Sequence, residues 1–216
     1  MKDILLGKDK TIPLDYDPSI LTPLSRLDSR IKSGLEGFAN LLHGIDYWTS
    51  YETSWLNPKG IPRNGILNIA YSCNSKFFVE SKSLKLYLYS LNNKKFDSVE
   101  SLKNTIRNDL ENILKTEVDI DLSDSPRPIE DIYLCLDDLQ IEKIDEYPNS
   151  LIIMPGEKTI SEELSCSLFR SLCPVTSQPD WATIYISYTG LEIEHKGLLQ
   201  YLLSYRNHQG FHEECV

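Results

Sequence analysis

The segment from Ser171 to Trp181 brings a thiol and a carboxyl group into a short stretch that two prolines interrupt. Its sequence is Ser-Leu-Cys-Pro-Val-Thr-Ser-Gln-Pro-Asp-Trp, so Cys173 and Asp180 stand seven positions apart. Pro174 and Pro179 lack a backbone donor and disfavour a helix or a central strand. We therefore predict a shaped loop that enters a strand near Trp181. A thiolate attacks electrophilic carbon, and a nearby carboxyl group can donate the proton that such an attack needs.

Each of these two residues also has an ordinary structural interpretation. Free cysteine is among the most buried residue types, so Cys173 alone also fits an inert core thiol. Asp180 alone also fits a solvated loop carboxylate or the cap of a strand. Nucleophilic chemistry becomes the better interpretation only if other functional groups accompany the pair.

His212 and Glu213 form a second candidate site. Adjacent histidine and glutamate can act as a base and a hydrogen-bond acceptor, although exposed residues at a helix terminus have the same appearance. His208 and His212 stand four positions apart, but no third and fourth convergent ligand is in view. The sequence therefore predicts no metal site.

The stretch Glu80-Ser81-Lys82-Ser83-Leu84-Lys85 is a third candidate site. Ser81 and Ser83 can cap a helix, and backbone N–H groups at a helix start bind anions. With Lys82 and Lys85 nearby, this stretch fits a phosphate contact for a dinucleotide or an ordinary helix start with solvated lysines. Neither the Gly-x-Gly-x-x-Gly fingerprint nor the P-loop pattern occurs, so a nucleotide cofactor must bind in another way.

The elements that must position these residues follow from apolar periodicity. From residue 47 to residue 154 the pattern predicts the order strand, strand, helix, helix, strand, strand. The expected strands are residues 46–56, 66–71, 118–122 and 151–154, and the expected helices are residues 84–91 and 98–114. The turn signal Asn-Pro-Lys-Gly at 57–60 predicts that the first two strands form a hairpin, and Ser98 or Ser101 can cap the second helix. Residues 1–46 contain three prolines and little apolar period, which predicts an arm.

A similar order begins again after residue 155. Residues 159–170 form a strand candidate for which a helix stays open, and residues 182–188 alternate as a strand does. Leu198, Leu199, Leu202 and Leu203 lie on one face of a predicted helix, and residues 211–216 resemble the start of another. The pattern indicates a second module of the same kind that stops before its second helix.

The bulk composition narrows the class of protein. The 216 residues carry a formal net charge of −10, which argues against a nucleic-acid backbone as the main partner. The five cysteines have irregular spacings without a Cys-x-x-Cys pair, so a zinc framework is not expected. We find no signal peptide and no apolar run long enough for a membrane span, and we expect a cytoplasmic protein with free thiols.

In this order, the three candidate sites resemble the NADPH-dependent 7-cyano-7-deazaguanine reductases of queuosine biosynthesis, in their long two-module form. The resemblance rests on Glu-Ser-Lys-Ser-Leu-Lys-Leu-Tyr-Leu at 80–88, on Cys173 with Gln-Pro-Asp-Trp at 178–181, and on Phe-His-Glu at 211–213. Residues 43–60 also resemble the long form, so the similarity covers nearly the whole chain.

The resemblance implies an α+β tunnelling fold of two tandem modules, each with antiparallel sheets that carry helices on one face. We expect an N-terminal arm over residues 1–46, a first module over residues 47–155 and an incomplete second module over residues 156–216. Modules of this fold usually associate, so a homodimer is also implied, without nucleic acid or membrane as a partner.

The resemblance further implies an oxidoreductase that converts a nitrile to a primary amine with two NADPH, a step of tRNA modification. Cys173 is expected to form a covalent thioimide, and Asp180 to act as the general acid.

Other positions are expected to bind. Glu80 and Glu213 would hydrogen-bond the deazaguanine edge, helped by the backbone at Val79 and Ser81, and His212 would lie beside the reacting group. Ser81 and Lys82 would contact NADPH.

Long-form relatives continue past the His-Glu motif with a part that includes an Arg-Gly pair for NADPH, whereas this sequence ends at Val216. We therefore expect a chain that is truncated at its C-terminus. An alternative is a non-catalytic deazapurine-binding tunnelling-fold module that uses the same pocket. A weaker alternative is a pterin-type cyclohydrolase of the same fold, which needs a zinc site that the spacings do not offer.

Overall fold

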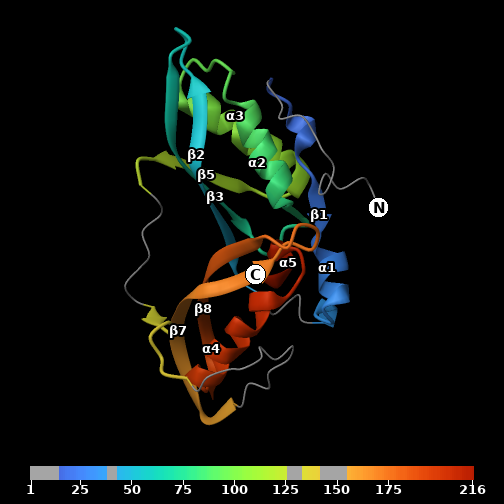
Figure 1. Cartoon of the computed structure of the whole chain (residues 1–216), viewed down its shortest axis with the longest axis vertical. Coiled ribbons are helices and arrows are strands. Elements are labelled where there is room, and N and C mark those ends of the chain that lie inside the picture. The colour runs from blue at the N-terminus through green and yellow to red at the C-terminus, as the bar shows by residue number, and fades with distance from the viewer. Residues whose placement is uncertain (1–14, 38–42, 126–132, 142–154) are drawn as a thin grey trace. The chain divides into compact units, whose positions relative to one another are not determined.

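The computed structural model describes residues 15–37, 43–125, 133–141 and 155–216 (Figure 1). The chain divides into two compact units, Met1–Pro128 and Ile129–Val216. Each unit combines helices with a sheet that is mainly antiparallel, which confirms the predicted α+β class. Within the described ranges, no helix has both the length and the apolar character needed to cross a membrane. The strand predicted at residues 151–154 lies outside the described residues.

The first unit is built on the antiparallel sheet β2-β3-β5. β2 (Ile45–Leu56) and β3 (Pro62–Ser72) form the predicted hairpin, and β5 (Val118–Ser123) pairs with the other edge of β3. Asn57 organises the hairpin turn, because its Oδ1 accepts hydrogen bonds from the backbone N–H groups of Lys59 (3.0 Å) and Ile61 (2.9 Å). Turn chemistry thus explains why this hairpin could be predicted.

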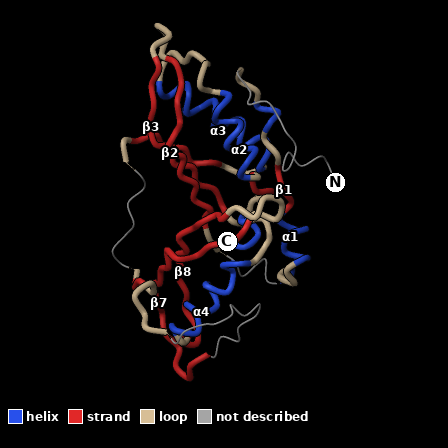
Figure 2. Tube along the Cα trace, viewed as in Figure 1, coloured by secondary structure: helices blue, strands red, loops and turns tan. Residues whose placement is uncertain are grey.

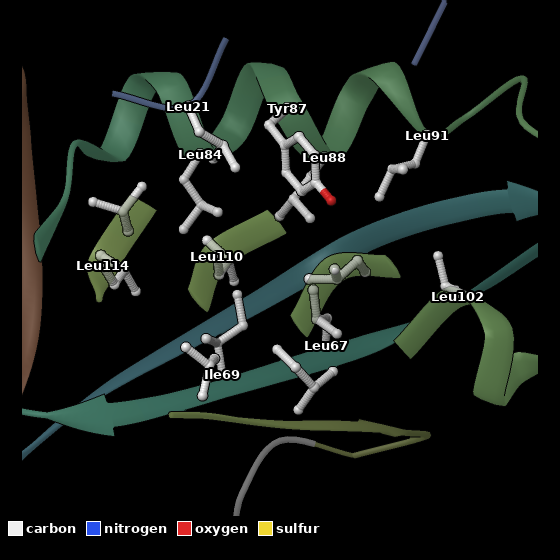
Figure 3. Packing of buried hydrophobic residues seen from close by; sticks show 14 of the residues in the cluster. Leu21, Leu67, Ile69, Leu84, Tyr87, Leu88, Leu91, Leu102, Leu110 and Leu114 are labelled. Carbon is white, nitrogen blue, oxygen red and sulfur yellow. The ribbon is translucent and has the colours of Figure 1, made fainter. Parts of the chain in front are cut away.

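Helices α2 (Ser81–Ser90) and α3 (Val99–Leu114) pack on this sheet. α3 begins at its predicted cap, since Ser98 Oγ accepts a hydrogen bond from Ser101 N at 3.1 Å. Leucines of both helices point toward Leu67 and Ile69 of β3 (Figure 3). Four residues of α3 recur at helical spacing and are fully buried: Leu102, Ile106, Leu110 and Leu114.

The N-terminal residues that the structure describes pack into the first unit, whereas the sequence indicated an arm. Along the chain, β1 (Pro23–Ser25) follows η1 (Pro18–Ile20) and precedes α1 (Arg26–Lys32). It pairs antiparallel with β4 (Phe77–Val79). Leu21 is only 5% exposed and belongs to the core. Three-residue strands show no periodicity and their pairing is long-range, so the sequence pattern could not reveal this packing.

The second unit is built on the sheet β6-β7-β8 (Figure 2). β7 (Pro155–Leu172) and β8 (Pro179–Ile193) form a long antiparallel hairpin, so residues 159–170 adopt the strand option. The two-residue strand β6 (Leu134–Cys135) pairs parallel with β7, an exception to the expected antiparallel pattern. β6 therefore belongs with the second unit, although we expected residues 47–155 to form one module, because its partner follows residue 155.

Helical segments complete the second unit: α4 (His195–Ser204), η3 (Tyr205–Asn207) and α5 (His212–Cys215). The predicted apolar face of α4 packs against the hairpin, with Leu198, Leu199 and Leu202 buried and Leu203 partly buried. Leu164 and Phe169 of β7 are fully buried in the same cluster. This core fixes the end of β7 from which the candidate site extends.

Candidate active site

Cys173 opens the loop that joins β7 to β8, as the two prolines predicted. The pair Leu172–Pro179 closes the hairpin, and the Cys173 backbone is tied across the loop by two hydrogen bonds. Its N–H donates to Gln178 O at 2.9 Å, and its carbonyl accepts from Ser177 N at 3.0 Å. The thiol is free and the residue is half-buried. Cys173 is therefore a loop residue rather than a core thiol.

Asp180 lies directly opposite Ser171 in the antiparallel pair of β7 and β8. Asp180 is half-buried, whereas Ser171 is completely buried. Side chains of directly opposed residues stand on the same face of a sheet, with Cβ atoms about 5 Å apart. The hairpin therefore presents a carboxyl group and a buried hydroxyl side by side, next to the Cys173 loop.

Two backbone hydrogen bonds, which together form a β-bridge, dock the C-terminal segment on the end of β7. Leu172 N donates to His208 O at 2.8 Å, Gly210 N donates to Leu172 O at 3.1 Å, and Leu172 forms a bridge with Gln209. The short helix α5 follows at once and starts with His212. These contacts bring His212 to the face of β7 that holds Ser171.

The imidazole of His212 contacts the hydroxyl of Ser171 and packs against the ring of Phe169. Its Nδ1 lies 2.7 Å from Ser171 Oγ, and its ring centroid lies 5.8 Å from that of Phe169. Burial lowers the pKa of His212, an effect that the nearby Asp180 and a hydrogen bond with the backbone of Trp181 partly offset. Its Nε2 is buried without a well-aligned hydrogen-bond partner among the described residues. The imidazole is therefore neutral at neutral pH and keeps one ring nitrogen for another partner.

Cys215 lies beside the same serine but differs from Cys173 in its surroundings. Its Sγ donates a weak hydrogen bond to Phe211 O at 3.3 Å. Burial raises the pKa of Cys215 to about 11, despite a contact with Ser171 that acts in the opposite direction. At neutral pH this thiol stays protonated and is a poor nucleophile.

Glu80 in the first unit caps helix α2. Its side chain is buried, and its Oε1 and Oε2 accept hydrogen bonds from Lys82 N (3.1 Å) and Ser83 N (2.7 Å). The cap is therefore Glu80 and neither Ser81 nor Ser83, because a carboxylate at this position satisfies both free donors at once. The prediction that these backbone N–H groups bind an anion fails for Lys82 and Ser83, since Glu80 already occupies them.

The segment before β2 and β3 helps to hold Glu80 in place. Glu80 N donates to Thr22 O at 3.0 Å, and Thr22 N donates to Ser83 Oγ at 3.0 Å. Ser83 Oγ in turn donates to Glu80 O at 2.7 Å. The β4–α2 junction, which carries Val79 to Lys82, is thus fixed by the N-terminal residues that the sequence indicated as an arm.

The predicted site residues therefore form two groups. Cys173, Asp180, His212 and Glu213 lie at the loop end of the second unit, and Val79, Glu80, Ser81 and Lys82 lie at the β4–α2 junction of the first. Among the described residues, no cluster of three or more His, Cys, Asp or Glu side chains could hold a metal ion. His208 and His212 stand on different elements and do not share a helix face.

Sequence reasoning missed Ser171 and Glu194. Glu194 caps α4 through Lys196 N (3.1 Å) and Gly197 N, just as Glu80 caps α2. The two helices also end alike, with serine hydroxyls donating 2.6 Å bonds from Ser90 to Tyr87 O and from Ser204 to Tyr201 O. The repeated Glu-x-Lys spacing at residues 80–82 and 194–196 was the signal in the sequence.

Two family models match the chain. The model described as "Nitrile reductase, 7-cyano-7-deazaguanine-reductase N-term" matches residues 13–122. The model described as "QueF-like protein" matches residues 179–216. The first match covers the β4–α2 junction, and the second covers Asp180, His212 and Glu213.

Curated relatives resemble the chain over almost its whole length. The NADPH-dependent 7-cyano-7-deazaguanine reductase of Desulfotalea psychrophila is 41% identical over 221 residues, covering 99% of this chain and 79% of the relative. Proteins of the same name are 40% identical in Acinetobacter baumannii strain SDF, with 98% and 79% covered, and 39% identical in Legionella pneumophila strain Corby, with 98% and 76% covered.

Proposed function

Because the chain belongs to the 7-cyano-7-deazaguanine reductase family, we propose that it reduces the nitrile of 7-cyano-7-deazaguanine to a primary amine with NADPH. One observation carries the proposal: Asp180 is paired with Ser171 beside the Cys173 loop, and His212 packs against the same serine. A thiol, a carboxyl group and a neutral imidazole thus gather at one end of the second unit. Covalent, acid-assisted attack on a nitrile needs groups of these kinds.

The reaction begins with a covalent bond to the protein. A nitrile is a poor hydride acceptor, and conversion to a thioimide divides one hard step into two easier ones. The thiolate of Cys173, whose proton has left to solvent, forms the S–C bond as one π bond of the nitrile breaks. Asp180 donates a proton to the nitrile nitrogen and becomes a carboxylate. Two NADPH molecules would each supply one hydride, the S–C bond would break between the two reductions to release the Cys173 thiolate and an imine, and the product would be 7-aminomethyl-7-deazaguanine.

Substrate recognition falls to Glu80 and Glu213, with the backbone at Val79 and Ser81. A guanine-like base presents N–H donors at its edge, and carboxylates accept these with charge assistance. Each carboxylate oxygen of Glu80 uses one lone pair for the cap of α2 and keeps a second for the base. The cap thus fixes the orientation in which Glu80 meets the substrate.

Ser81 and Lys82 are the residues of this chain that would hold NADPH. A hydroxyl and an ammonium group at the start of a helix suit a phosphate. Because Glu80 occupies the backbone donors of Lys82 and Ser83, phosphate recognition at this junction relies on side chains.

We also propose that the two units are tandem tunnelling-fold modules of one chain. Two copies of the chain would form a homodimer, which would act in queuosine biosynthesis in the cytoplasm. An antiparallel hairpin in each unit and the matched caps of α2 and α4 support the tandem relation.

The decay of NADPH absorbance in the presence of 7-cyano-7-deazaguanine tests the function. We expect decay that depends on the substrate and yields the aminomethyl product. Binding of the base without NADPH oxidation would instead favour the deazapurine-binding module.

A further inference from the structure

Ser171 is a fully buried polar residue at the centre of the candidate site. It stands opposite Asp180 across the hairpin, and its Oγ lies 2.7 Å from Nδ1 of His212. A buried hydroxyl is destabilising unless it is hydrogen-bonded, so its partners decide how its single proton is used. Among the described residues, the side chains of His212 and Cys215 both contact this hydroxyl and compete for its proton.

The competition favours His212. Cys215 already donates its own proton to Phe211 O, and a thiol sulfur is a weak acceptor. An imidazole nitrogen is a better acceptor, and the distance to Nδ1 is that of a good hydrogen bond. We therefore assign the Ser171 hydroxyl as the donor and Nδ1 as the acceptor.

This assignment fixes the position of the ring proton. A neutral imidazole carries one N–H, and because Nδ1 accepts, the proton must lie on Nε2. That Nε2 is buried without a well-aligned hydrogen-bond partner among the described residues, and the ring makes only a weak contact with the backbone of Trp181. An unsatisfied buried donor is unfavourable, which indicates a partner that arrives from elsewhere.

We propose that Ser171 is a positioning residue for the nitrile reduction, which holds His212 as the Nε2–H tautomer so that this N–H is available to the nitrogen of the bound substrate. The proposal rests on the proposed function for its substrate. Asp180 and His212 then act from the same end of the hairpin: the carboxyl group transfers a proton, and the imidazole N–H stabilises the nitrogen that receives it. Ser171 itself touches no reacting atom.

Two substitutions at the serine separate positioning from packing. Ser171→Ala removes the hydroxyl, whereas Ser171→Thr keeps it on a side chain that strands accept. We expect Ser171→Ala to slow formation of the Cys173 adduct by about tenfold to a hundredfold, the scale of a misplaced catalytic group. The Kd for the substrate should change less than about twofold, because the base-binding carboxylates are untouched, and Ser171→Thr should recover most of the rate.

Ser161→Ala is the matched control, since Ser161 lies on the same strand and its Oγ contacts Thr189 Oγ1 at 2.8 Å, away from His212. A normal rate in Ser171→Ala would overturn the proposal. So would an equal loss in Ser161→Ala, or a folded Ser171→Thr that stays as slow as Ser171→Ala.

A second measurement needs neither turnover nor a variant that folds. The chain has four histidines, so ¹⁵N NMR of the labelled protein gives a simple imidazole spectrum. His212 should show an unprotonated Nδ1 and a protonated Nε2, and a protonated Nδ1 would overturn the proposal. Failure of the wild-type protein to form any adduct counts against the proposed function and leaves the NMR result as a separate test of Ser171.

Discussion

Burial sets the protonation states of the two titratable side chains that contact Ser171. It raises the pKa of Cys215 to about 11 and lowers the pKa of His212, so both groups are neutral at neutral pH. Cys173 lies only two positions from Ser171 but sits in the loop, half-exposed. Both cysteines are half-buried, so the same short region holds one thiol whose pKa is raised by burial and one that lies in a loop.

The lowered pKa of His212 predicts a pH dependence of stability. The unfolded state binds the proton more tightly, so stability from the neutral ring is complete above about pH 6.5, the ordinary histidine pKa. It is lost as the pH falls from there through the lower pKa of the folded state. Between about pH 7.5 and about pH 5.5, urea unfolding should show a larger loss of stability for the wild-type protein than for His212→Gln. Equal losses would show that His212 does not carry this dependence.

At the scale of elements, glutamates begin one helix in each unit in the same way. Glu80 is buried at the start of α2, whereas Glu194 is exposed at the start of α4. Both glutamates cap a helix, but only Glu80 is proposed to bind the substrate. Substitution of Glu194 therefore serves as a control for the loss of a helix cap alone.

Each of Glu80→Ala and Glu194→Ala should lower the free energy of unfolding by about 1 kcal/mol, the usual cost of a lost cap. Only Glu80→Ala should also weaken binding of 7-cyano-7-deazaguanine, measured by calorimetry. If Glu194→Ala weakened binding as much, loss of helix stability alone would explain both results.

The N-terminal segment offers a second comparison between matched residues. Leu21 is 5% exposed in the core, whereas Leu27 on α1 is 61% exposed. Leu21→Ala should cost about 2–5 kcal/mol of unfolding free energy, and Leu27→Ala less than about 0.5 kcal/mol. Urea unfolding curves measure both. Equally small losses of unfolding free energy in the two variants would indicate that residues 15–32 form a loose arm, as the sequence suggested.

Over the whole molecule, local signals were enough to predict local structure. Turn residues at Asn57 to Gly60 marked the β2–β3 hairpin, apolar spacing marked α3, and Pro174 with Pro179 marked the Cys173 loop. The pairing of β1 with β4 and of β6 with β7 could not be predicted, because such short strands show no periodicity and their partners lie far along the chain.

The candidate site follows the same division between local and long-range signals. Residue types and the resemblance pointed to Cys173, Asp180 and Glu80, but the contact of Ser171 with His212 spans 41 positions and no local pattern announces it. The capping role of Glu80 was also not predicted, because serine is the commoner capping residue and Ser81 and Ser83 are close to it in the sequence.

The covalent role of Cys173 is the central claim, and intact-mass analysis after incubation with 7-cyano-7-deazaguanine without NADPH tests it most directly. Cys135 is a free thiol that is more exposed than Cys173, so Cys135→Ala is the matched control. We predict one substrate adduct on the wild-type protein and on Cys135→Ala, and no adduct on Cys173→Ala. An adduct that persists in Cys173→Ala, or a wild-type protein that binds the substrate without gaining its mass, would contradict the account.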